Sequence, residues 1–131
     1  MKRTAINPND WSIPFEFNQG ELVEGHTRTL YCSGQTAIGD DGQAKHAGDF
    51  RAQAQLAIDN LKAVLAGADM TFANVVRMTI FTTDTEAALA NFDILSETAK
   101  AAGVRPAQTL IGVAALAFPE LMIEIEATAV A

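Results

Sequence analysis

Two glutamates alternate with isoleucines near the end of the chain, in the run Ile123-Glu124-Ile125-Glu126. In a β-strand this alternation places Glu124 and Glu126 on one face of the strand and both isoleucines on the other. A carboxyl group on a packed face needs a partner, and beside a bound ligand it can act as a general acid or base. The pattern therefore leaves two interpretations open: a catalytic carboxylate, or a buried or interfacial ion pair with Arg77 or Arg105.

The other residue types that could do chemistry are sparse. His26 and His46 lie in segments that favour loops and have no further ligands at metal-binding spacing, so we expect solvated histidines and no metal site. Cys32 is the only cysteine and follows apolar residues, which predicts a small core residue in a strand rather than a nucleophile. The chain contains no phosphate-binding loop, GxGxxG, HExxH or GxSxG motif.

Length and charge narrow the class of protein. The 131 residues suit one domain over residues 1–131, and 49% hydrophobic content predicts a folded core. A net charge of −7 disfavours binding to nucleic acid or to an anionic membrane. We find neither a long apolar run nor a secretory leader, and a single cysteine suits a reducing compartment, so the expected location is cytoplasmic.

Hydrophobic periodicity predicts an α+β fold, with two helices on one face of a mixed sheet. Strand 29–33 leads into the segment 36–39, and the Asp40-Asp41-Gly42 sequence that follows predicts a hairpin turn. The first helix should end at Gly67 in a left-handed cap, and the second should begin with a Thr83–Glu86 capping box. The remaining expected elements are helices over 49–66 and 85–102 and strands over 75–82, 108–116 and 121–130.

Both faces of the predicted sheet carry apolar side chains, although two helices can cover only one of them. In strand 75–82, for example, Met78 and Ile80 point to one face, and Val75 and Phe81 to the other. An uncovered apolar face favours burial against another copy of the chain, and closed symmetry is the usual outcome.

Three stretches of the chain resemble the RidA/YjgF/YER057c/UK114 family, also called L-PSP or reactive-intermediate deaminases. They are Tyr31-Cys32-Ser33-Gly34-Gln35, the run from Gly48 through Leu65, and Arg105-Pro106-Ala107-Gln108-Thr109 followed by Ile123–Ala127. The resemblance implies a chorismate-mutase-like fold and a homotrimer with ligand clefts between subunits. Deaminase members hydrolyse enamines and imines to a keto acid and ammonia, and no metal or organic cofactor is implied.

The resemblance also implies a set of site residues. The family carboxylate that handles water or a proton falls on Glu124, and the cleft glycine and asparagine fall on Gly34 and Asn91. Phe17 replaces a family tyrosine and so keeps the ring without the hydroxyl group. Leu110 stands where the family has a cysteine.

Gln108 is the most consequential departure from the family pattern. Deaminase members have an arginine there that binds the substrate carboxylate. An amide offers only neutral hydrogen bonds, and losing the charge-assisted pair should cost about 2–3 kcal/mol. Arg105 lies three residues earlier, so strand alternation would point it to the opposite face, where it could not substitute.

Three hypotheses follow for the function. The first is a hydrolase that acts on an enamine, imine or related C–N bond of a small metabolite other than the usual 2-imino acid. The second is a trimer that binds a metabolite, or regulates a partner, without turnover. The third is the ribonuclease activity ascribed to some relatives, which the net charge and the missing arginine disfavour.

Overall fold

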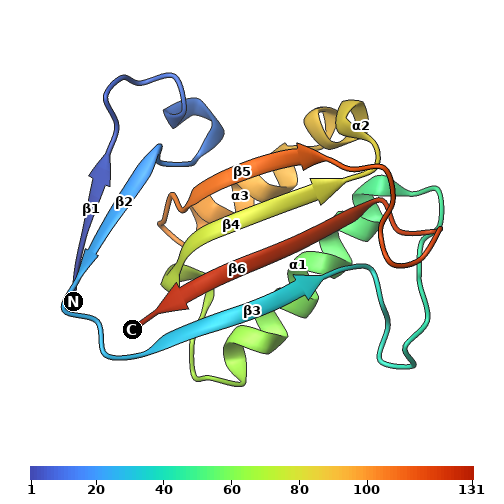
Figure 1. Ribbon diagram of the computed structural model, residues 1–131, viewed down its shortest axis with the longest axis horizontal. Helices are drawn as coiled ribbons and strands as arrows, with labels where there is room; N and C mark the ends of the chain where they lie inside the picture. Colours follow the sequence, from blue (N-terminus) through green and yellow to red (C-terminus); the bar gives the residue numbers. More distant parts are fainter.

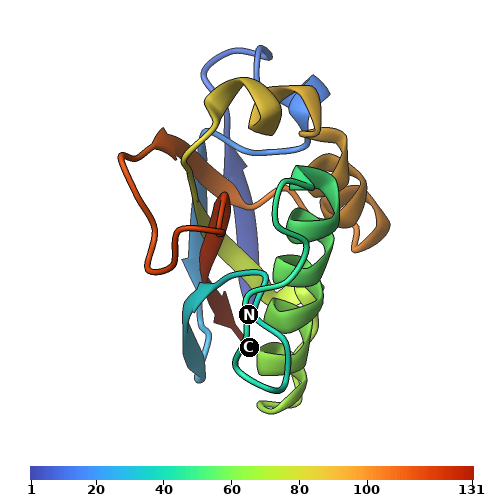
Figure 2. The same cartoon turned by 90° about the vertical axis from the view of Figure 1, so that its right-hand side faces the viewer.

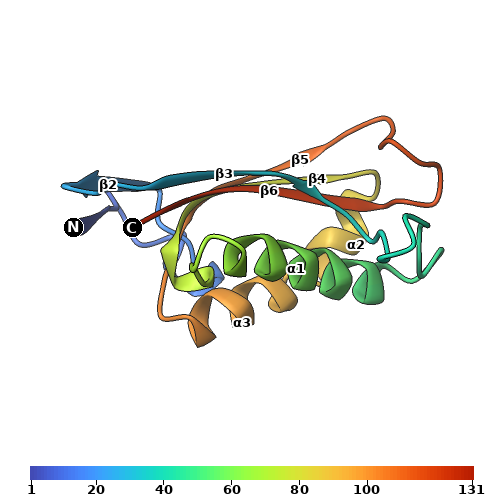
Figure 3. The same cartoon turned by 90° about the horizontal axis from the view of Figure 1, so that it is seen from below.

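A four-stranded sheet forms one layer of the molecule, and helices form the second layer on one face of that sheet (Figures 1, 2 and 3). The computed structural model describes residues 1–131. The strand order is β3-β6-β4-β5, with β4 and β5 parallel and the other pairs antiparallel. The strands are β3 (Thr29–Gln35), β4 (Val75–Thr82), β5 (Ala107–Gly112) and β6 (Ile123–Val130). The prediction of an α+β fold with a mixed sheet is confirmed.

Helix α1 (Phe50–Ala66) runs along one face of the sheet, against β6 and β3, and supplies much of the core (Figure 3). Asp49 caps it by accepting a hydrogen bond from the Ala52 amide, and Ile58, Leu61 and Leu65 are fully buried. The predicted left-handed cap at Gly67 is wrong, because Gly67 keeps a right-handed φ of −61°. The chain turns two residues later, where Asp69 has a φ of 55°.

The second predicted helix is two helices, α2 (Thr85–Ala90) and α3 (Asp93–Ala101). Asp84 caps the N-terminus of α2 by accepting a hydrogen bond from the Ala87 amide, so the predicted Thr83–Glu86 capping box is also wrong. The break falls at Asn91, whose side-chain amide donates to the Ala87 carbonyl at 2.9 Å. An asparagine that hydrogen-bonds the preceding turn competes with the helical ladder, which accounts for the interruption.

The N-terminal residues form a separate hairpin beside the sheet (Figure 1). Strands β1 (Lys2–Ile6) and β2 (Gly20–Glu24) pair antiparallel, and residues 7–19 connect them. Arg3 ties the hairpin to the rest of the fold, because its guanidinium donates to the carbonyls of Ala73 and Val75 and pairs with Glu21. These contacts hold the hairpin against the start of β4.

The predicted hairpin around Asp40-Asp41-Gly42 is only a tight turn. Gly42 adopts the left-handed φ of 76° that such a turn requires, but the flanking residues form one isolated bridge, between Ile38 and Ala44. Asn60 of α1 donates to the carbonyls of Thr36 and Ile38 at 2.9 Å each. The helix thus satisfies the carbonyls on one edge of this segment, while the returning residues 43–45 bond the backbone of Ala37 and Gly39 on the other edge.

The face of the sheet opposite the helices is uncovered in the single chain, and we call it the open face. Alternation in β6 is confirmed, with Ile123, Ile125, Ala127 and Ala129 buried toward the helices. The open face is mixed in character, since it carries Tyr31 and Ile111 as well as Arg77 and Glu126. Its burial against another copy of the chain stays a prediction. None of the helices is both long and apolar enough to cross a membrane.

Candidate functional site

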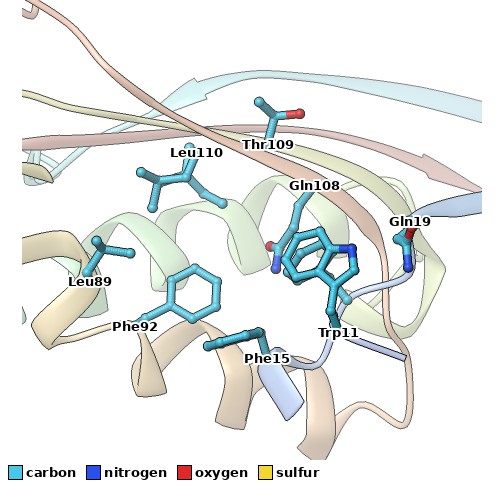
Figure 4. A pocket seen from close by; sticks show the side chains of 10 residues that line it. Trp11, Phe15, Gln19, Leu89, Phe92, Gln108, Thr109 and Leu110 are labelled. Atoms are coloured by element: carbon cyan, nitrogen blue, oxygen red, sulfur yellow. The ribbon is translucent and has the colours of Figure 1, made fainter. Parts of the chain in front are cut away.

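A pocket of about 660 Å³ opens at the free edge of β5 (Figure 4). The N-terminal connecting segment forms one wall, and the junction of α2 and α3 forms another. Most of the lining is apolar, and no charged side chain contributes to it. The lining residues are Trp11, Phe15, Phe17, Gln19, Ile80, Leu89, Phe92, Gln108, Thr109 and Leu110.

Hydrogen bonds and one ion pair hold the N-terminal wall in place. The Arg105 Nε donates to Glu16 Oε2 at 2.9 Å, and the Asn18 amide donates to the Arg105 carbonyl at 3.1 Å. Glu16 ends a 3-10 turn (Ile13–Phe15) in a left-handed conformation with φ of 59°. Because the chain directly after Phe15 is anchored to Arg105, the Phe15 ring is held in the wall of the pocket.

Four aromatic rings line the pocket in two edge-to-face pairs. The ring centroids of Trp11 and Phe17 are 5.3 Å apart with planes at 78°, and those of Phe15 and Phe92 are 6.4 Å apart at 76°. Edge-to-face pairs add about 0.5–1.5 kcal/mol to the burial of the rings, which favours a defined geometry. The pocket therefore offers apolar ring surfaces as its main binding feature.

Gln108 is the unpartnered polar group of the pocket. It pairs in register with Met78 on the helix side of the sheet, and its side-chain oxygen is buried without a hydrogen-bond partner. An unpaired buried amide oxygen costs about 1–3 kcal/mol, so a ligand that donates a hydrogen bond there would recover that energy. The site can recognise a neutral polar group, and it lacks a cation to bind a carboxylate.

The structure brings together three of the predicted site residues, Phe17, Gln108 and Leu110, which all line the pocket. Asn91 does not line it, because its amide caps α2 and its carbonyl oxygen lies 3.5 Å from Arg51 Nη1. Arg105 is also outside the lining. Arg105 precedes β5, so strand alternation does not decide where its side chain points. The ion pair with Glu16 holds the Arg105 guanidinium outside the pocket.

Glu124 and Gly34 form a second group, on the open face. Glu124 pairs in register with Phe81, whereas Gln108 pairs with Met78, so the two side chains lie on opposite faces of the sheet. A Cβ atom built on Gly34 would lie 2.6 Å from Glu124 Oε1, so the glycine makes room for this carboxylate. Within one chain the carboxylate does not reach the pocket.

Within the single chain neither glutamate forms an ion pair with Arg77 or Arg105, and an ion pair between subunits stays a prediction. Arg77 donates to Thr109 Oγ1 at 2.7 Å and Arg105 pairs with Glu16, so neither arginine bonds Glu124 or Glu126. Glu124 is half-buried and makes no salt bridge. A half-buried carboxylate without a structural partner is free to interact with a ligand or another chain.

The structure also places the cysteine and the two histidines, all of which lie outside the pocket. Cys32 is buried in the core, and burial raises the pKa of its thiol, which disfavours the nucleophilic thiolate at neutral pH. His26 and His46 are exposed. No three His, Cys, Asp or Glu side chains come together as metal ligands.

Sequence reasoning missed most of the apolar lining, including Trp11, Phe15, Leu89 and Phe92. The available signal was the concentration of aromatic residues in the irregular segment before residue 20. Large apolar side chains in such a segment need a surface to contact. Pairing them with Phe92, far along the chain, required the tertiary structure.

Comparison with known proteins identifies the family to which the chain belongs. A family model described as Endoribonuclease L-PSP matches residues 15–131. The chain belongs to this L-PSP family, also called the RidA/YjgF or Rid family. Among curated relatives, this L-PSP chain is 35% identical over 117 residues to the RutC family protein YjgH of Escherichia coli, covering 89% of this chain and 88% of that one.

Solved structures agree with the family assignment. The Rid protein YyfB from Yersinia pestis, described as of unknown function, is 39% identical with a TM-score of 0.88, and all of both chains is covered. TdcF of Escherichia coli, solved with bound serine, is 26% identical with a TM-score of 0.70 and covers 88% of this L-PSP chain and 87% of its own. The L-PSP fold is therefore shown along the whole chain.

Proposed function

We propose that this L-PSP chain forms a homotrimer whose clefts between subunits hydrolyse the C–N bond of a small enamine or imine that is not a 2-imino acid. The observation that carries the proposal is the unpartnered Gln108 amide in a pocket without a charged side chain. TdcF, a relative solved with bound serine, supports the binding of a small metabolite by this fold.

The lining of the pocket argues against a carboxylate substrate. A buried carboxylate needs a cation or several donors to offset its lost hydration. Gln108 supplies one neutral amide, and the neighbouring Arg105 is engaged with Glu16. A neutral imine loses much less hydration on entering an aromatic pocket, and its N–H can donate to the Gln108 oxygen.

The proposed reaction needs water and one proton-transfer group. An enamine first takes a proton on carbon and becomes an iminium ion, which is the protonated form of the imine; water then adds to the iminium carbon and loses a proton, giving a neutral carbinolamine. Collapse of the carbinolamine breaks the C–N bond and releases ammonia and a carbonyl product. Glu124 would accept the proton of water and return it to the departing nitrogen.

The position of Glu124 sets a requirement on the assembly. Because Glu124 lies on the open face, away from the pocket of its own chain, a neighbouring subunit must supply this carboxylate to the cleft. One trimer then contains three equivalent clefts. Without this contribution no titratable side chain lines the pocket, and this observation favours a second candidate function, a trimer that binds a metabolite without turnover.

Ammonia release from two substrates tests the proposal. One is 2-aminoacrylate, generated in situ by a threonine dehydratase acting on serine, and the other is benzophenone imine, a neutral ketimine. We expect this protein to accelerate hydrolysis of the neutral ketimine and to have little effect on 2-aminoacrylate. Binding of the ketimine without acceleration would identify the second candidate. Faster hydrolysis of 2-aminoacrylate than of the ketimine would overturn the role of Gln108.

Two substitutions separate the roles of the site residues. Glu124→Gln should abolish turnover in a folded trimer, and unchanged turnover would rule out Glu124 as the proton-transfer group. Gln108→Arg should raise hydrolysis of 2-aminoacrylate by about 30–100-fold, because it restores a charge-assisted pair. No gain in a well-folded trimer would contradict Gln108 as the specificity residue.

A further inference from the structure

We propose that the pocket recognises a neutral aromatic ring that bears a carboxamide. This inference deepens the proposed function, on which it rests, because it names the class of substrate that the same cleft would accept. It follows from the shape of the aromatic walls, from the one buried polar atom of the lining that has no hydrogen-bond partner, and from the absence of a charged side chain among the lining residues of the single chain.

The walls favour a flat, apolar group. Trp11 and Phe17 come from the N-terminal segment, and Phe92 faces Phe15 from the α2–α3 junction (Figure 4). Trp11 is 58% exposed and Leu89 is 64% exposed, although both border the pocket. Large apolar side chains left this open gain about 25 cal/mol for each Å² that a ligand covers. An aromatic ring fits the edge-to-face arrangement of these walls.

Only one polar side-chain atom of the lining is buried without a hydrogen-bond partner. The side-chain nitrogen of Gln19 is occupied, because it donates to the Asn9 carbonyl at 2.9 Å and to Asn9 Oδ1 at 3.0 Å. Thr109 is occupied as well, since its hydroxyl oxygen accepts from Arg77 at 2.7 Å. Gln108 makes no side-chain hydrogen bond, and its oxygen is buried.

A carboxamide is the complement of this free group. A glutamine amide carries two N–H donors and one carbonyl acceptor, and a second amide can bond it in both directions. A carboxylate of the same shape could only accept, which would leave the Gln108 oxygen unpartnered and bury an unpaired charge. The same ring with a carboxamide and with a carboxylate should therefore bind with different affinities.

Binding of benzamide and benzoate tests the inference. Trp11 is the only tryptophan and lines the pocket, so its fluorescence reports occupancy, and calorimetry provides an independent measurement. We expect benzamide to bind about tenfold or more tightly than benzoate. Cyclohexanecarboxamide, which keeps the amide but lacks the aromatic ring, should bind more weakly than benzamide.

Substitutions at Gln108 should change this preference in defined directions. Gln108→Arg should reverse it, with benzoate gaining about tenfold or more. Gln108→Leu should weaken the binding of benzamide and leave the affinity for benzoate unchanged. This second variant keeps the test available if the arginine variant does not fold. Gln55→Arg, at an exposed position on α1 outside the pocket, adds the same charge and should leave both affinities unchanged.

The outcomes are distinguishable from those of the proposed function, because binding needs no turnover. Equal or tighter binding of benzoate by the unmodified protein, or no binding of benzamide, would overturn the inference. Benzamide binding that Gln108→Leu does not weaken would do so as well. A protein that hydrolyses the neutral ketimine but rejects benzamide would retain the proposed function and lose this inference.

Discussion

Replacing Gly34 with alanine would move the Glu124 carboxylate while leaving the backbone unstrained. The φ of Gly34 lies outside the left-handed range, so an alanine can adopt it. The new Cβ would lie 2.6 Å from Glu124 Oε1, 2.7 Å from its Cδ and 2.8 Å from its Cγ. These atoms belong to a flexible side chain, so we expect the carboxylate to move and the sheet to stay in place.

The size of the displacement follows from the contact distances. Ordinary contact with a Cβ begins at 3.4 Å, so Glu124 Oε1 must move by at least 0.8 Å. A misplacement of about 1 Å in a catalytic group can lower turnover by about 100-fold. We therefore expect Gly34→Ala to lower kcat for the neutral ketimine by about 10–100-fold. Stability should change by no more than about 1 kcal/mol, because alanine also restricts the unfolded chain.

Turnover and thermal unfolding are measured together, with Gly39→Ala as the matched control. Gly39 also has a φ outside the left-handed range, and a Cβ there would lie 2.6 Å from Lys45 Cε, again the end of a flexible side chain. Gly39→Ala should keep full turnover. If Gly34→Ala also kept full turnover while Glu124→Gln abolished it, the argument that Gly34 positions the carboxylate would be refuted.

Three further predictions concern stability and reactivity. Gln53→Leu should lower the free energy of unfolding by about 2–4 kcal/mol. The fully buried Gln53 side chain donates to the Glu120 carbonyl at 2.7 Å and accepts from the Met122 amide at 2.8 Å, and the substitution removes both bonds. An unchanged urea midpoint would contradict this prediction. Cys32 should react with iodoacetamide more slowly than free cysteine at neutral pH, since burial raises the pKa of its thiol, and equal rates in the native protein would show that the site opens. Hydrogen bonds from Arg51 lower the pKa of Asp93, so the ionised carboxylate stabilises the folded state at pH values above the unfolded pKa. This stabilisation is lost as the pH falls through the lower, folded pKa. The Tm difference between the wild type and Asp93→Asn should therefore shrink on acidification, and a Tm difference that grows would contradict this prediction.

Local patterns predicted the helices and strands of the main sheet well and their ends less well. The apolar stripe of α1 predicted the buried face that is observed, and alternation in β6 predicted which side chains are buried. Gln53 interrupted the expected pattern because its amide bonds the distant loop before β6. The ends of α2 depended on Asp84 and Asn91, whose side chains compete with backbone groups one turn away.

The site was only partly accessible to sequence reasoning. Phe17, Gln108 and Leu110 were predicted from family resemblance and lie together in the pocket. Glu124 was predicted from the same source and lies on the opposite face of the sheet. Its role in a cleft therefore depends on how subunits associate, which alternation within a single strand does not describe.

The amino-acid sequence by itself determined the family, the α+β class, the two-faced pattern of β6 and the glutamine at position 108. These features depend on residue type and short spacing, which periodicity and family motifs record. The tertiary structure decided which distant segments meet. It placed Phe15 against Phe92, engaged Arg105 with Glu16, and left the Gln108 amide without a partner. Such contacts join residues that are far apart along the chain, and no local pattern in the sequence encodes their distance or the burial that makes an unpaired amide costly.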